Sequence, residues 1–170
     1  MNEKHIEFQI MFEAHMFIGP MFSGKSTELL RQVSRYKAIG MNVLVVNHTN
    51  DTRTDESIKT HNNVKHKAVK VKVLKSLLEE NMLMDIDIIA IDEAQFFPDL
   101  KKFILKIERS NLILYMAGLD GDSNRNPFGQ ILECIPLCDY VVKLRALDMI
   151  NCDGHTKAPF SLRVKDTSDS

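Results

Sequence analysis

The stretch Gly19-Pro20-Met21-Phe22-Ser23-Gly24-Lys25-Ser26 fits the phosphate-binding pattern G-x-x-x-x-G-K-[ST] and decides the fold of this chain. The apolar run 14–18 before it predicts a buried strand, and from Thr27 onward apolar residues recur at helical spacing. A loop between a strand and a helix directs backbone N–H groups and the positive end of the helix dipole at one point, which makes an anion site. The alternative is a glycine-containing turn that matches by chance, and the flanking strand and helix argue against it.

The residue types within this loop suit phosphate. Gly19 and Gly24 allow the backbone to approach phosphate oxygens without a Cβ clash. Lys25 would bring a positive charge to the β- and γ-phosphates, and Ser26 would offer a hydroxyl ligand to Mg²⁺. The loop therefore predicts a site for a nucleoside triphosphate.

Two acidic residues, Asp92 and Glu93, follow a second strand-like run at 86–91. The carboxyl ends of buried parallel strands form the rim at which α/β sheets bind ligands. Adjacent carboxylates repel each other unless a cation or a proton intervenes. Asp92 therefore fits the acid that holds the metal in a nucleoside triphosphatase, and Glu93 is left for base chemistry. The alternative is that the pair, or Asp99, only caps the following helix, and Asp99 suits that purpose better.

Strand-like and helix-like segments alternate along the rest of the chain. Strands are expected at 42–47, 69–73, 112–117 and 140–144, the last being the final strand; helices are expected up to Gly40, from Ser76, from Leu100 and through 131–132. The polar range 48–63 is expected to be a long, mobile loop. This alternation predicts an α/β fold of the P-loop NTPase type, with a mostly parallel sheet flanked by helices.

Bulk properties exclude several classes of function. The 170 residues suit one compact domain, and a net charge of −1 gives no electrostatic reason to expect a nucleic-acid partner. No apolar run approaches the roughly 20 residues that span a bilayer, and residues 1–10 lack a signal-peptide core. We therefore expect a cytoplasmic protein with no membrane partner. Its three cysteines are expected to be reduced thiols, with Cys134 and Cys138 in the core.

Six short motifs resemble those of the type II thymidine kinase family. In chain order they are Gly-Pro-Met-Phe-Ser-Gly-Lys-Ser-Thr-Glu-Leu (19–29), Asp-Thr-Arg (51–53), Asp-Glu-Ala-Gln-Phe-Phe (92–97), Ala-Gly-Leu-Asp-Gly (117–121), Val-Val-Lys-Leu (141–144) and Ala-Pro-Phe-Ser (158–161). They cover nearly the whole chain and are far more specific than a bare phosphate loop. The resemblance implies ATP-dependent transfer of the γ-phosphoryl group to the 5′-hydroxyl of thymidine, for nucleotide salvage and DNA synthesis. It also implies a homo-tetramer that carries zinc.

The resemblance further implies roles for single residues. Glu93 is expected to be the base that takes the 5′-hydroxyl proton, and Arg53 to stabilise the transferring phosphoryl group; a solvated loop arginine is the alternative for Arg53. Thymidine contacts are expected from Met21, Phe96, Leu119 and Ser161, although Phe96 and Phe97 could equally belong to the core. ATP contacts are expected from Gly19, Pro20, Met21, Phe22, Ser23, Gly24, Lys25, Ser26, Thr27, Arg53, Asp92 and Gln95, with Ser26 and Asp92 holding Mg²⁺.

The chain also departs from the family pattern. Ser123 stands where the family usually has a phenylalanine that helps to hold the base. After Leu144 the family has a Cys-x-x-Cys pair, a substrate-covering loop and a second pair of metal ligands. Here only Cys152 and His155 have the spacing of one zinc-binding pair, and no Cys or His follows them. We therefore expect a kinase α/β domain at 1–147, a reduced C-terminal zinc-type element at 148–170, and clearly less than one zinc per chain.

The sequence thus predicts a thymidine kinase, with two alternatives. A nucleotide hydrolase or motor-like ATPase would share the glycine loop and the acidic strand end. A divergent nucleotide-binding protein with weak or no turnover is favoured by the missing covering loop. Release of ADP that thymidine stimulates would separate a kinase from the first alternative, the nucleotide hydrolase.

Overall fold

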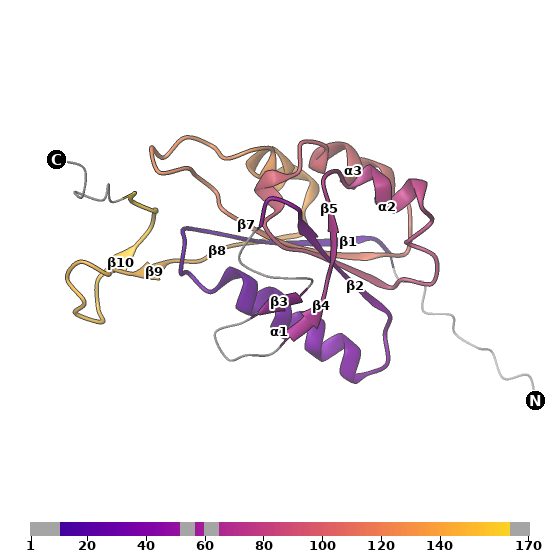
Figure 1. The fold of residues 1–170 in the computed structure, drawn as a ribbon, viewed down its shortest axis with the longest axis horizontal. Helices are drawn as coiled ribbons and strands as arrows, with labels where there is room; N and C mark the ends of the chain where they lie inside the picture. Colours follow the sequence, from indigo (N-terminus) through magenta and orange to yellow (C-terminus); the bar gives the residue numbers. More distant parts are fainter. Residues whose placement is uncertain (1–10, 52–56, 60–64, 164–170) are drawn as a thin grey trace, which may run out of the picture.

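The computed structural model describes residues 11–51, 57–59 and 65–163. Within these residues, the centre of the molecule is a six-stranded sheet in which neighbouring strands all run parallel (Figure 1). Across the sheet the strands are β5 (Val69–Val71), β2 (Val43–His48), β6 (Ile88–Ile91), β7 (Ile113–Gly118), β1 (Glu13–Ile18) and β8 (Tyr140–Lys143). The predicted α/β fold with a parallel sheet is confirmed.

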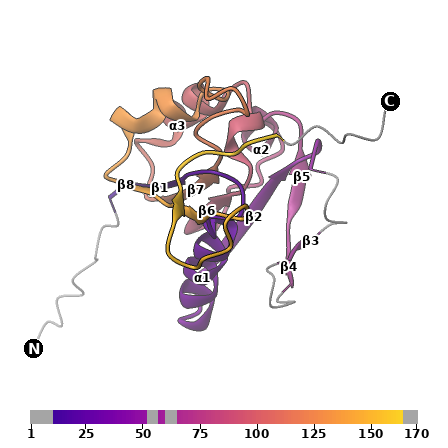
Figure 2. The ribbon, with the colours of Figure 1, turned by 90° about the vertical axis from the view of Figure 1, so that its left-hand side faces the viewer.

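Helices cover both faces of this sheet. Figure 2 shows α1 (Lys25–Ala38) on one face, and α2 (Lys75–Glu79) and α3 (Leu100–Ile107) on the other. Two further helices are of the 3₁₀ type, η1 (Ala94–Phe96) and η2 (Ile131–Leu137). Because β6 and β7 lie between the two layers, they are buried at every position, as their continuous apolar sequences predict. No helix in the described part of the chain is long and apolar enough to cross a membrane.

The carboxyl ends of the parallel strands meet at one edge of the sheet. β1 leads there into the glycine loop, β6 into Asp92 and Glu93, and β7 into Leu119. The backbone at this edge is fixed by hydrogen bonds between neighbouring strands, such as Asp92 N to Val46 O at 2.9 Å and Leu144 N to Ile18 O at 2.8 Å. The candidate site residues are therefore attached to a hydrogen-bonded edge of the central sheet.

Two small sheets lie outside the predicted arrangement. β9 (Ala146–Leu147) and β10 (Lys157–Ala158) form an antiparallel hairpin that projects beyond the end of β8 (Figure 1), so 140–144 is not the last strand. β3 (Ser57–Lys59) pairs with β4 (Lys65–Lys67). β3 falls within the range expected to be a loop, and this expectation is wrong there. Strands of two or three residues are too short for a recognisable alternation of polar and apolar residues.

The expected start of α2 at Ser76 and the expected capping of α3 by Asp99 are also wrong. Ser76 does not open α2, which begins at Lys75, and its hydroxyl donates to Val73 O at 2.7 Å. Asp99 precedes α3, but its carboxylate makes no capping bond to that helix. It accepts instead from the N–H groups of Leu74 and Lys75, at 3.0 and 2.9 Å. Asp99 therefore caps the neighbouring helix in space rather than the next helix in sequence.

Candidate active site

The glycine loop connects β1 to α1 as predicted, and two of its glycines are needed for different reasons. Gly24 has a φ of +85° directly before α1, a left-handed conformation that glycine adopts without strain. A Cβ on Gly19 would lie 2.4 Å from the carbonyl oxygen of Leu144. The close approach at Gly19 is therefore to the backbone that follows β8, whereas the sequence suggested an approach to phosphate oxygens.

The side chain of Lys25 lies against the loop backbone. Its Nζ donates to Pro20 O at 2.5 Å and lies 3.4 Å from the hydroxyl of Ser23, which also donates to Pro20 O at 2.8 Å. An ammonium group interacts more strongly with an anionic phosphate than with a neutral carbonyl. A bound triphosphate would therefore draw the Lys25 ammonium from Pro20 toward the phosphate oxygens.

Ser26 and Asp92 are brought together as predicted. The Ser26 hydroxyl donates to Asp92 Oδ1 at 3.0 Å, and the same oxygen accepts from the N–H of Glu93 at 3.0 Å. Asp92 is buried, so its carboxylate is held in place. Hydroxyl and carboxylate oxygens are ligands that Mg²⁺ uses beside phosphate oxygens and water. This pair fits a Mg²⁺ site of that kind.

Glu93 and Gln95 form a second buried link at the same edge. Glu93 has a φ of +52°, which is uncommon for a residue with a side chain and is found more often at functional sites. Its Oε2 accepts from Gln95 Nε2 at 2.5 Å, and Gln95 Oε1 accepts from Leu119 N at 3.0 Å. Gln95 therefore ties the Glu93 carboxylate to the end of β7. This link is not evident from the sequence, and the expected contact of Gln95 with ATP stays a prediction.

The two phenylalanines after the acidic pair have different surroundings. Phe97 is fully buried in the core. Phe96 is half-buried, and its ring meets Phe128 edge-on at 5.4 Å and His48 at 5.7 Å. Phe96 is therefore available to border the site, whereas Phe97 is not.

His48 and Phe128 both contact Phe96 at the candidate site, and the sequence analysis assigned neither of them to it. His48 is buried, its Nδ1 accepts from Asn50 N at 3.0 Å, and its Nε2 therefore donates to Lys72 O at 3.1 Å. A single histidine at a strand end gives no signal of this kind in a sequence. Phe128 could have been suspected, because a lone aromatic residue between Pro127 and Gly129 stands out in a polar loop.

Ser161 reaches the glycine loop from the far end of the chain. Its Oγ accepts from the N–H of Met21 at 2.8 Å, and the Met21 side chain is 44% exposed. Two of the predicted thymidine contacts, Met21 and Ser161, are therefore hydrogen-bonded to each other. The other two, Phe96 and Leu119, flank the Glu93–Gln95 link.

Arg53 lies outside the described residues. The backbone that leads to it is firmly held at Asp51, which is buried. Asn47 Nδ2 donates to the Asp51 carboxylate at 2.9 Å, and Lys70 Nζ donates to its carbonyl at 3.1 Å. Of the remaining predicted ATP contacts, Phe22 and Thr27 are both exposed at the loop and the first turn of α1.

Cys152 and His155, the predicted half of a zinc site, lie in the turn between β9 and β10. The Cys152 thiol donates to Met149 O at 3.0 Å. The Asp153 carboxylate accepts from the hydroxyl and N–H of Thr156, at 2.7 and 2.8 Å, and from the N–H of His155 at 2.8 Å. These bonds, with the Thr156 hydroxyl first, lower the pKa of Asp153 to about 2.

Structural zinc requires four tetrahedral ligands. Within residues 11–51, 57–59 and 65–163, no three His, Cys, Asp or Glu side chains are grouped so that they could hold a metal ion. The residues present therefore do not fit a zinc site of the family's type. Hydrogen bonds to two carboxylates hold this turn instead. Besides the bonds to Asp153, the Asp148 carboxylate accepts from the N–H of Ile150 at 2.8 Å and from Nδ2 of Asn151 at 2.6 Å.

Comparison with known proteins gives a single family. The family model for thymidine kinase matches residues 12–170, which is nearly the whole chain. The chain belongs to the thymidine kinase family. The resemblance to type II thymidine kinases is thereby confirmed, and the chain is a kinase by family.

Similar curated proteins are thymidine kinases of poxviruses. The chain is 41% identical to the thymidine kinase of Yaba monkey tumor virus over 155 residues, which cover 91% of this chain and 83% of the relative. It is 40% identical to that of Monkeypox virus over 164 residues, covering 96% and 85%, and 38% identical to that of Vaccinia virus (strain Ankara) over 169 residues, covering 99% and 88%. The family match and the alignments with the last two relatives therefore include both the glycine loop and the Ser161 region.

Proposed function

We propose that this chain transfers the γ-phosphoryl group of ATP to the 5′-hydroxyl of thymidine and so forms thymidine monophosphate and ADP. The observation that carries the proposal is the buried Asp92 carboxylate, which accepts from both the Ser26 hydroxyl and the N–H of Glu93. Ser26 directly follows Lys25 of the glycine loop, and Glu93 adds a second buried acidic residue. Phosphoryl transfer depends on positioned phosphates, a metal ion and a group that orients the attacking hydroxyl. These residues supply that set.

The roles divide by charge and position. Lys25 and the loop N–H groups would bind the phosphates of ATP, and Ser26 and Asp92 would hold Mg²⁺. When bound, Mg²⁺ neutralises negative charge on the β- and γ-phosphate oxygens. Glu93 would accept the proton of the 5′-hydroxyl as the 5′-oxygen bonds to the γ-phosphorus and the bond to the β,γ-bridging oxygen breaks. Arg53 would add positive charge beside the transferring group.

Thymidine would lie against the apolar side of this edge. Phe96, Met21 and Leu119 offer apolar surface for a flat base, and Ser161 offers a hydroxyl beside Met21. Phe128, which contacts Phe96, would add a further aromatic wall.

We further infer that the protein works in the cytoplasm as a homo-tetramer. The edge strand β8 supports self-association, because Tyr140, Val141 and Val142 are 57%, 38% and 43% exposed on a strand with a free side. Light scattering of the purified chain measures this directly. A mass of one chain at micromolar concentration would contradict the tetramer.

The activity is tested with γ-labelled ATP and each of the four deoxynucleosides in turn, with Lys25→Ala as the matched control. Labelled thymidine monophosphate that appears with the unaltered chain, and not with the variant, supports the proposal. Hydrolysis of ATP at the same rate with and without thymidine would refute it. Preferred labelling of another deoxynucleoside would refute thymidine as the substrate.

A further inference from the structure

The loop 121–127 presents Arg125 on a fixed support. The Asp122 carboxylate accepts from the N–H groups of Asn124 and Asn126, at 2.8 and 2.9 Å, and the Arg125 N–H donates to Asp122 O at 3.0 Å. Arg125 itself has a φ of +65°. These bonds, the one from the Asn126 N–H first, also lower the pKa of Asp122. The Asp122 carboxylate is therefore charged at neutral pH and can accept both bonds. The loop is therefore ordered before any ligand binds.

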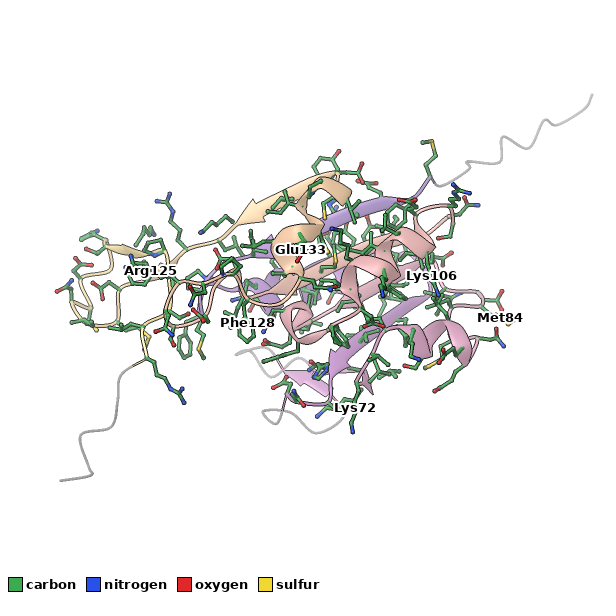
Figure 3. The ribbon with its side chains drawn as sticks, turned by 90° about the horizontal axis from the view of Figure 1, so that it is seen from above. Lys72, Met84, Lys106, Arg125, Phe128 and Glu133 are labelled. Atoms are coloured by element: carbon green, nitrogen blue, oxygen red, sulfur yellow. The ribbon has the colours of Figure 1, made fainter. Side chains whose placement is uncertain are left out.

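The guanidinium group of Arg125 meets an aromatic ring from the end of the chain. Its Cζ lies 5.0 Å from the centre of the Phe160 ring, within the range of a cation–π interaction. Within the described residues no carboxylate pairs with Arg125, so the ring is its principal partner. Figure 3 shows Arg125 and Phe128 on the side of the molecule away from Met84, with Arg125 farther out.

Phe160 is followed directly by Ser161, whose hydroxyl accepts from the Met21 N–H in the glycine loop. Consecutive residues cannot move independently, so a contact that holds Phe160 also limits where Ser161 can lie. The short segment 158–161 is thus attached to the 121–127 loop at one residue and to the glycine loop at the next.

We propose that Arg125 is a positioning residue for the nucleoside, which acts through Phe160 to hold Ser161 beside Met21. This inference rests on the proposed function and deepens it. It assigns part of the affinity for the nucleoside to a residue that lies outside the proposed base contacts Met21, Phe96 and Leu119. An exposed cation–π contact corresponds to a factor of about two to five in an equilibrium constant. Such a contact biases the segment toward its held position and still lets it open for nucleoside exchange.

The chain offers a spectroscopic test that does not depend on activity. It contains no tryptophan, so Phe160→Trp introduces a single indole at the contact. In this background, Arg125→Ala should increase quenching of the indole by acrylamide, and Arg125→Lys should increase it less, because lysine keeps the charge. Arg109→Ala is the matched control, since Arg109 is also exposed but lies two residues after the end of α3. Equal quenching in the Arg125→Ala and control variants would overturn the contact.

Kinetics then separate positioning from general structural damage. In the otherwise unaltered chain, Arg125→Ala should raise KM for thymidine about two- to fivefold, with kcat and KM for ATP unchanged. Arg125→Lys should recover part of the loss, and Phe160→Leu should add little to Arg125→Ala, because both remove the same contact. A fall in kcat with KM unchanged, or additive losses in the double variant, would overturn the proposal.

If the unaltered chain phosphorylated no nucleoside, the proposed function would fail together with this assignment of nucleoside affinity. The quenching comparison would still decide whether the Arg125–Phe160 contact exists.

Discussion

The Ser26 hydroxyl donates a 3.0 Å hydrogen bond to the carboxylate of Asp92 across 66 positions of sequence. It joins the first turn of α1 to the end of β6, so the phosphate loop and the acidic strand end form one unit. A change on either side of this bond should therefore alter binding of the nucleotide more than stability of the fold.

Replacing Lys25 by alanine tests the phosphate side of this unit. The ammonium contacts Pro20 and Ser23 of the loop, so its loss should change the melting temperature without ATP little. ATP at a hundredfold excess over Kd should stabilise the unaltered chain by ~2.7 kcal/mol, and the variant much less. Thermal unfolding with and without ATP measures both quantities. Equal shifts in the two proteins would contradict the assignment of the phosphate site.

Glu93→Gln keeps the size of the side chain and an oxygen that can accept from Gln95. It removes the basic group, so kcat should fall by ~10²–10⁴-fold while affinity for ATP changes little. Steady-state kinetics combined with ATP titration distinguish these effects. Loss of ATP and Mg²⁺ binding, with turnover preserved at saturation, would mean that Glu93 is a metal ligand and not the base.

Gly129→Ala tests the packing beneath Gln95. A Cβ at this position would lie 2.0 Å from the Gln95 carbonyl oxygen, at a φ of +61°. Gly40→Ala is the matched control, with a φ of +83° and no atom within 4 Å of the added Cβ. The control should lose about 1–2 kcal/mol of unfolding free energy through its left-handed conformation, and Gly129→Ala about 1–3 kcal/mol more through overpacking. Urea denaturation measures the difference in unfolding free energy between the two variants. Equal losses would show that the backbone at Gln95 shifts away from the added Cβ at no cost.

Thiol labelling tests the surroundings of the three cysteines. Burial raises the pKa of the Cys134 thiol to about 11 and that of Cys138 to about 12, so at pH 7–9 both stay largely protonated and unreactive. Cys152 is exposed. One thiol per native chain should therefore react quickly with a maleimide, and Cys152→Ser should abolish that phase. Two or three fast thiols would show that Cys134 and Cys138 are not shielded from the reagent.

Zinc content tests whether the β9–β10 turn is organised without a metal. The Asp148 and Asp153 carboxylates already bind the N–H groups of this turn, and Cys152 with His155 makes only half of a four-ligand site. Elemental analysis of the purified chain should find clearly less than one zinc per chain, with no change after Cys152→Ala. Stoichiometric zinc that this substitution removes would mean that a ligand from elsewhere completes the site.

The sequence predicted the parts of this molecule that follow from local patterns. The glycine loop, the strands around it and the Ser26–Asp92 pair all follow from one rule, that the carboxyl ends of parallel strands share an edge. The contacts of Gln95 with Glu93 and Leu119 could not be predicted in the same way. They depend on how η1 turns after the left-handed Glu93, and a sequence carries no periodic signal for a single such residue.

Asp99 shows a second limit of sequence reasoning. An aspartate before an apolar periodic segment is a standard helix-capping signal. Its carboxylate nevertheless serves α2, because the folded chain brings the start of that helix within 3.0 Å. A polar side chain near a helix end can bond to any backbone N–H group that tertiary packing brings close to it. A rule based on local sequence cannot predict which of these groups it binds.

The position of β1 in the sheet has a consequence for the order in which the protein is made. β1 pairs with β7 and β8, with Glu13 opposite Ile113 and His15 opposite Tyr140. On the ribosome, the strand that carries the glycine loop emerges well before β7 and β8, its two neighbours in the described sheet. Such distant pairing slows folding and leaves an apolar strand uncovered during translation. The nascent chain should therefore acquire nucleotide binding late and all at once, and ribosome-bound chains that end before Tyr140 should depend on chaperones.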